Sequence, residues 1–123
     1  MMKKLLLILL FLPMIGFGQS KGKMINQIIE NTKKDIKLPY KSDYTLWYDV
    51  VNENNESIVF LHLCSEKDFE KLGMTKSRLI SENKSTPFGK FVGSNNITIV
   101  TRYLNYDYLL IKEIKISPND WDN

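Results

Sequence analysis

The segment Ser57–Cys64 constrains the fold more than any other part of the sequence. It is apolar on both of the faces that strand alternation would give it. One face carries Ile58, Phe60, His62 and Cys64, and the other carries Val59, Leu61 and Leu63. A strand of this kind is typical of the interior of a sheet whose two faces are both covered. We therefore expect Ser57–Cys64 to be a central strand.

Two hairpins are predicted, and this strand belongs to the first. Tyr44–Val51 is rich in aromatic and β-branched residues, and the polar turn Asn52–Glu56 joins it to Ser57–Cys64. The second hairpin joins Ile97–Leu104 to Tyr108–Ile116. Consecutive hairpins favour a largely antiparallel sheet.

Helical patterns precede and separate the hairpins. In Lys23–Ile36 the isoleucines recur at helical spacing and form one apolar stripe. Ser65 is an N-cap followed by Asp68 at the capping-box position, and Gly73 is a suitable C-terminal stop. Thr75 can cap a further short helix. The sequence therefore predicts an N-terminal helix and one or two short helices between the hairpins.

Two segments show no regular pattern. Ser85–Gly93 contains a proline and two glycines, which predicts a poor edge strand or a loop with one extended stretch at Lys90–Val92. Asn119–Asn123 follows Pro118 and is expected to fray. The complete order predicts an α+β fold of two layers, with a mostly antiparallel sheet of four to five strands.

The first residues have the composition of an export signal. Lys3 and Lys4 precede the apolar run Leu5–Ile15, and small residues at 16 and 18 mark a cleavage site before Gln19. The run is shorter than the roughly 20 residues that span a bilayer. We therefore expect residues 1–18 to be a signal peptide, residues 19–123 to be a single domain in the periplasm or outside the cell, and no membrane span after cleavage.

The charge of the chain argues against a nucleic-acid partner. The formal net charge is +3, and Lys3 and Lys4 in the predicted signal supply two of these charges. The remainder is close to neutral, whereas nucleic-acid binding requires a concentrated basic face. We expect a protein or a cell-envelope ligand instead.

His62 and Cys64 are the only histidine and the only cysteine. Their Cα atoms would lie about 6.6 Å apart on one strand face, so a thiolate–imidazole pair is an alternative to a non-enzymatic role. This alternative is a small thiol-dependent hydrolase. However, no oxyanion donor or orienting acid is identifiable, and Ile58 and Phe60 on the same face indicate burial. Two ligands are too few for zinc, so neither a metal nor a cofactor is expected.

Aromatic residues are the remaining functional signal, because tyrosine and tryptophan are enriched at binding surfaces. Trp47 and Tyr48 would face opposite sides of their strand, so at least one can lie on an uncovered sheet face. The candidates for ligand binding are Trp47, Tyr48, Tyr103 and Tyr106. The alternative is that most aromatic side chains fill the core. The sequence thus predicts an exported, non-enzymatic binding domain of unspecified ligand, acting through a sheet face or through the hairpin tips Asn52–Glu56 and Asn105–Asp107.

Overall fold

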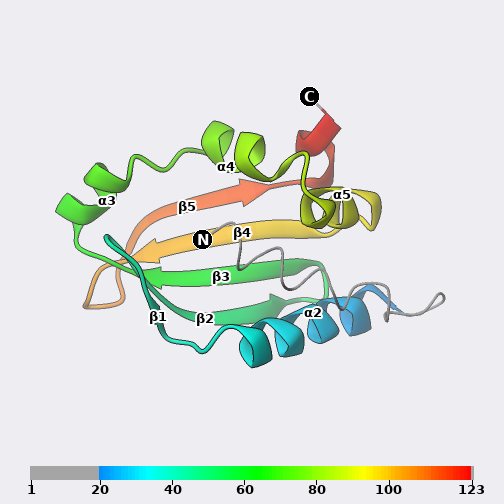
Figure 1. Ribbon diagram of the computed structural model, residues 1–123, viewed down its shortest axis with the longest axis horizontal. Helices are drawn as coiled ribbons and strands as arrows, with labels where there is room; N and C mark the ends of the chain where they lie inside the picture. The colour runs from blue at the N-terminus through cyan, green and yellow to red at the C-terminus, as the bar shows by residue number, and fades with distance from the viewer. Residues whose placement is uncertain (1–19, 123) are drawn as a thin grey trace.

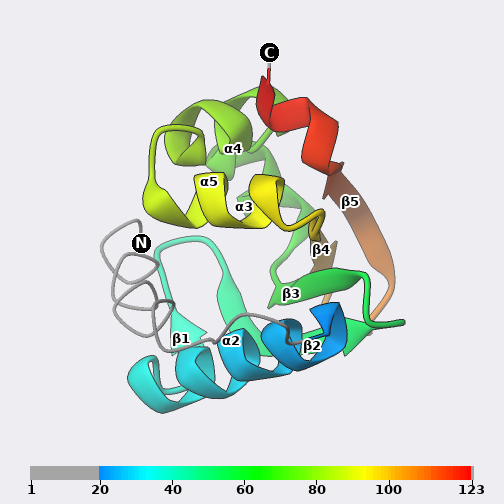
Figure 2. The same cartoon turned by 90° about the vertical axis from the view of Figure 1, so that its right-hand side faces the viewer.

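The computed structural model describes residues 20–122 and contains one sheet with helices on one of its faces (Figures 1 and 2). The strands lie in chain order, and only β3 and β4 are parallel. They are β1 (Tyr40–Lys41), β2 (Leu46–Glu53), β3 (Ser57–Leu63), β4 (Thr98–Leu104) and β5 (Leu110–Ile116). The predicted α+β fold with a mostly antiparallel sheet is confirmed. The predicted signal peptide lies outside the described residues.

The first helix covers one half of the sheet. α2 (Lys21–Asp35) begins after Ser20, whose hydroxyl accepts a hydrogen bond from the Lys23 amide at 3.2 Å. Its buried isoleucines, Ile25, Ile28 and Ile29, face the strands as the helical spacing predicted. Figure 2 shows α2 lying along β1 and β2. The predicted amphipathic N-terminal helix is therefore confirmed.

Helices in the crossover between β3 and β4 cover the other half. α3 (Glu66–Leu72) is capped by Ser65, whose hydroxyl accepts from the Asp68 amide at 3.0 Å, and it ends at Gly73 with φ of 61°. α4 (Lys76–Asn83) is capped by Thr75. Both caps were predicted correctly, because each capping oxygen belongs to a side chain next to its helix in the sequence.

A third helix replaces the predicted strand or loop. α5 (Pro87–Ser94) includes the whole of Lys90–Val92, so the expectation of an extended stretch there was wrong. The Thr86 hydroxyl accepts from the Gly89 amide, and Pro87 occupies the first helical turn, where its missing N–H is not needed. The crossover thus holds three short helices rather than one or two.

The chain returns onto α5 at its C-terminal end. The 3₁₀-helix η2 (Pro118–Asp122) places Trp121, which is only 7% exposed, against this helix, so the prediction of a frayed tail was wrong there. The close approach of α5 to Trp121 and to Asn83 depends on two glycines of this helix. A Cβ at Gly93 would lie 3.2 Å from the Trp121 ring, and one at Gly89 would collide with the Asn83 carbonyl oxygen.

No helix of residues 20–122 lies on the second sheet face (Figure 2). Strand β3 is central, as predicted, but helices cover only one of its faces. On the other face Val59 is fully buried beside Val100. Arg102 on this face forms ion pairs of 3.0 Å with Glu53 and with Glu113. Long paired side chains therefore shield the valines in place of a second layer.

We predict that Gly89→Ala destabilises the protein by about 1–3 kcal/mol, because the added methyl group must displace the Asn83 carbonyl or shift α5. Denaturant unfolding measures the loss. Lys90→Ala, on the exposed side of the same helix, is the matched control and should change stability by less than about 0.5 kcal/mol. Equal stabilities for the two variants would contradict the close packing of Gly89 against Asn83.

Candidate functional site

Three rings form a row across the helix-covered face of the sheet. Trp47, His62 and Tyr103 occupy paired positions on β2, β3 and β4. The His62 ring centroid lies 6.1 Å from that of Trp47 and 5.0 Å from that of Tyr103, and both pairs are stacked. All three side chains are at most 5% exposed. The row therefore belongs to the interior layer rather than to the open face.

A bulge in β2 directs Trp47 inward. The register shifts between Trp47 and Asp49, so Tyr48 has no partner on β3. The Trp47 indole Nε1 donates a 3.0 Å hydrogen bond to the Asp49 carbonyl oxygen across the bulge. The extra residue allows Trp47 and Val50 to be buried on the same side, although simple alternation would separate them.

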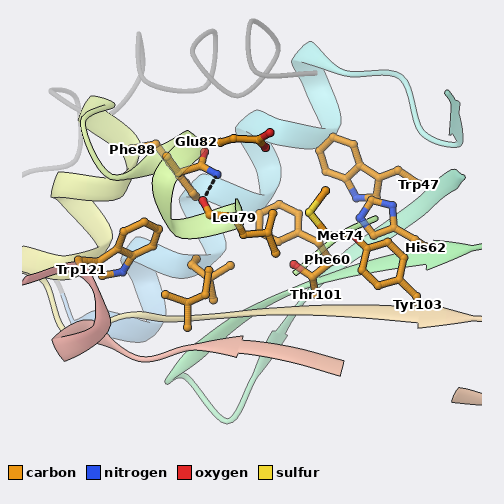
Figure 3. Close-up of a pocket in the computed structure, with 13 residues that line it drawn as sticks. Trp47, Phe60, His62, Met74, Leu79, Glu82, Phe88, Thr101, Tyr103 and Trp121 are labelled. Atoms are coloured by element: carbon orange, nitrogen blue, oxygen red, sulfur yellow. Dashed lines mark hydrogen bonds between the residues drawn. The ribbon is translucent and has the colours of Figure 1, made fainter. Parts of the chain in front are cut away.

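Beside this row lies a cleft, which we define by its lining residues (Figure 3). Strands β2 to β5 supply its floor, and α4, α5 and η2 supply its walls. Its volume is about 100 Å³. The residues are Trp47, Phe60, His62, Met74, Leu79, Glu82, Asn83, Phe88, Ile99, Thr101, Tyr103, Ile116 and Trp121. Such a lining, mostly apolar with a few polar groups, is typical of binding sites.

Buried polar atoms without partners are concentrated at the cleft. Among the described residues, His62 Nδ1, Asn83 Oδ1 and Trp121 Nε1 lack any hydrogen-bond partner, as does Asp35 Oδ2 elsewhere. The three cleft residues are at least 92% buried. The Asn83 Nδ2 atom, by contrast, donates to the Leu79 carbonyl oxygen at 2.9 Å. An unpaired buried polar group is costly, and three of the four belong to residues that line this one cavity.

Among the three rings of the row, only the His62 imidazole has a pKa below 7. Burial lowers the pKa of its imidazole to about 4, because the charged form loses its hydration between the neighbouring rings. The side chain is therefore neutral near pH 7. A neutral imidazole can donate one hydrogen bond and accept another, which suits a predominantly apolar cleft.

Cys64 does not belong to the cleft. Its side chain is completely buried, and burial, with a smaller contribution from Asp68, raises the pKa of its thiol. No hydrogen bond or ring contact joins Cys64 to His62 in the described part of the chain; His62 instead stacks on Trp47 and Tyr103. A nucleophilic cysteine needs a lowered pKa and an adjacent base. This arrangement provides neither.

The four aromatic residues predicted to bind a ligand do not lie together. Trp47 and Tyr103 line the cleft, whereas Tyr48 contacts Tyr108 edge-on with ring centroids 6.2 Å apart. Tyr106, in the turn between β4 and β5, is 57% exposed. Of the two hairpin tips, Asn52–Glu56 is held against α2 by hydrogen bonds from Asn52 to Asn26 and from Lys21 to Glu56. In the Asn105–Asp107 tip, Tyr106 and Asp107 are exposed.

Sequence reasoning missed the cleft residues supplied by the crossover and the C-terminal end. Asn83 and Phe88 lie in segments whose patterns gave no functional signal, and Trp121 was assigned to a frayed tail. The presence of a tryptophan near the end of the chain was the one available signal, because large aromatic side chains are usually buried.

Two further properties concern residues 20–122. No helix there combines the length and apolar character needed to cross a membrane. No three side chains of His, Cys, Asp or Glu in this range are grouped so that they could hold a metal ion.

Comparison with solved structures shows that other proteins share this fold. No protein-family model matches the sequence, and a search of curated proteins finds no relative. A Pseudomonas aeruginosa protein described as secreted superposes with a TM-score of 0.66 at 10% identity, covering 85% of this chain and 98% of its own. A pilotin from the type 2 secretion system of Vibrio vulnificus gives 0.58 at 11% identity, with 82% and 94% covered. At these identities the likeness concerns the fold alone.

We predict that stability falls by up to about 3 kcal/mol as the pH is lowered from 6.5 to about 4. In this window the unfolded chain binds a proton at His62 and the folded chain does not, so acid favours unfolding. Urea unfolding at several pH values measures the slope. His62→Phe keeps a ring in the row and should lose this part of the pH dependence. An unchanged slope would show that His62 is not responsible.

We predict that Cys64 reacts with a thiol reagent at least about a hundredfold more slowly in the native protein than in denaturant, because reaction requires opening of the fold. The rate of colour development with a disulfide reagent measures this ratio. As a control, Ser85→Cys in a Cys64→Ser background places the thiol at an exposed position and should react rapidly. Rapid native labelling of Cys64 would support the thiol-hydrolase alternative.

Proposed function

We propose that the protein is an exported, non-enzymatic binding domain that takes an apolar side chain of a partner protein into the cleft. The observation that carries this proposal is the coincidence of an apolar cavity with three unpartnered polar atoms, those of His62, Asn83 and Trp121. The apolar walls supply affinity through burial, and the polar atoms supply orientation.

The size of the cleft supports a side chain rather than a larger ligand. A volume of about 100 Å³ is smaller than the cavity of about 150 Å³ that accepts benzene in a model protein. A cofactor or an oligosaccharide would need more room. One large aliphatic side chain would fit this space, and the main-chain amide groups beside it would lie near the unpaired atoms at the cleft walls.

The chemistry available at the cleft also favours binding over catalysis. His62 is neutral and stacked on both sides, and Cys64 lies outside the lining with a raised thiol pKa. Glu82, the single carboxylate in the lining, is paired with Arg78 at 3.0 Å. We find no nucleophile with an activating base among the described lining residues.

The fold likeness supports a setting in the cell envelope. One structure of similar fold is described as secreted, and another is a pilotin of a secretion system. Together with the signal-like residues 1–18, these likenesses support action in the periplasm or outside the cell. The most specific form of the proposal is a pilotin-like role, in which the domain contacts a protein of the cell envelope.

Substitution at the cleft tests whether partner binding depends on it. Leu79→Glu introduces a charge into the lining and should weaken partner capture about tenfold or more, because burying an unpaired carboxylate is costly. Leu109→Glu changes an exposed leucine outside the lining and is the matched control. Thermal unfolding of both variants verifies that they fold. Equal capture by folded Leu79→Glu and Leu109→Glu proteins would contradict the proposal.

Photo-crosslinking tests the same point without disturbing the cleft walls. A benzophenone amino acid placed at Glu82, on the cleft rim, should form an adduct with the partner in intact cells, and the same residue at Lys34 on α2 should not. Mass spectrometry of the adduct should identify an apolar segment. Adducts that form only at Lys34 would place the interaction elsewhere.

A further inference from the structure

The outer edge of strand β5 is a second surface with unused bonding groups. Within the described part of the chain, β5 lies at the end of the sheet and pairs only with β4 (Figure 1). In an antiparallel pair, alternate residues direct their N–H and C=O groups away from the partner strand. No backbone hydrogen bond connects the outer side of Leu110–Ile116 with any other residue in the range 20–122. The main chain of β5 is therefore available for pairing.

A groove runs along this edge, which we call the edge groove. One side is formed by Lys112, Glu113, Ile114 and Lys115, and the other by Phe69 and Met74–Lys76. Consecutive residues of a strand face opposite sides of the sheet, so a cavity lined by four of them in succession follows the edge itself. Its volume is about 540 Å³, considerably larger than the cleft.

The edge groove is positively charged. Its lining contains Lys76, Lys112 and Lys115 against one carboxylate, that of Glu113. Glu113 is paired with Arg102, and Lys76 is paired with Asp120 at 3.0 Å. Lys112 and Lys115 are exposed and make no ion pair with a described residue. The two lysines therefore present uncompensated charge on either side of the free main chain.

We propose that the edge groove binds an extended acidic segment of a partner polypeptide, which adds to the sheet as a strand beside β5. Main-chain hydrogen bonds to β5 would supply much of the affinity, as in other cases of strand addition. Acidic side chains on both faces of the added strand would reach Lys112 and Lys115, while the half-buried Phe69 and Met74 supply apolar contact. This site is distinct from the cleft and does not rest on the function proposed for it.

The opposing view is that the lysines serve only to keep other strands away, a common property of edge strands. The two views predict different effects of the charge of an added strand. A purely protective edge rejects every added strand, whereas a binding edge accepts an acidic strand and rejects a basic one.

The test uses amide NMR of the isotope-labelled full chain with two synthetic peptides, one alternating pairs of valines with pairs of glutamates and the other alternating pairs of valines with pairs of lysines. Adjacent residues of a strand face opposite sides, so each peptide carries charge on both of its faces. We expect the glutamate peptide to shift the amide resonances of Leu110–Ile116 and to slow the hydrogen exchange of alternate residues there. The lysine peptide should cause neither change. Failure of the glutamate peptide to bind at millimolar concentration, or equal binding of both peptides, would overturn the proposal.

Variants distinguish peptide binding at the edge groove from non-specific charge attraction and from binding at the cleft. The double variant Lys112→Glu, Lys115→Glu should weaken binding of the glutamate peptide at least about tenfold. Lys34→Glu with Lys90→Glu makes the same change in net charge at exposed positions on α2 and α5, and should leave binding within about twofold. Leu79→Glu, which alters the cleft, should also leave it unchanged. Equal losses in both double variants, or concentration-dependent shifts in β5 without peptide, would favour charge attraction or self-pairing and overturn the proposal.

Discussion

The parallel pairing of β3 with β4 is the constraint on which the rest of the structure depends. It joins two antiparallel hairpins into one sheet, and parallel neighbours require a long crossover between them. That crossover contains α3, α4 and α5, which cover the β4–β5 half of the face, while α2 covers the β1–β2 half. The cleft lies beside the row of rings on that face, so its position follows from the pairing. Its three unpartnered polar atoms come from β3, α4 and η2, three elements that only this arrangement brings together.

The sequence predicted those features that depend on local chemistry. The capping oxygens of Ser65 and Thr75, the isoleucine stripe of α2 and the strand-forming segments are all local patterns, and the structure contains each of them. α5 was missed because its proline and two glycines have low helix propensity, which packing against Trp121 overrides.

The candidate site was less accessible to sequence reasoning, because it depends on contacts between distant residues. Trp47 and Tyr103 were identified as candidates from residue type alone, but nothing local indicates that His62 lies between them. That contact requires the register of β3 with both neighbours. The bulge at Tyr48, which brings Trp47 into this register, leaves no signature in residue composition. Asn83 and Trp121 meet the cleft only through tertiary packing.

Both tryptophans of the chain line the cleft, although they are separated by most of the folded sequence. Trp47 lies at one end of the row of rings, and Trp121 is packed against α5. Indole emission from this protein therefore originates entirely from the surroundings of one cavity. The intensity and wavelength of this emission should therefore change, without any added label, when a group enters the cleft and excludes water from it.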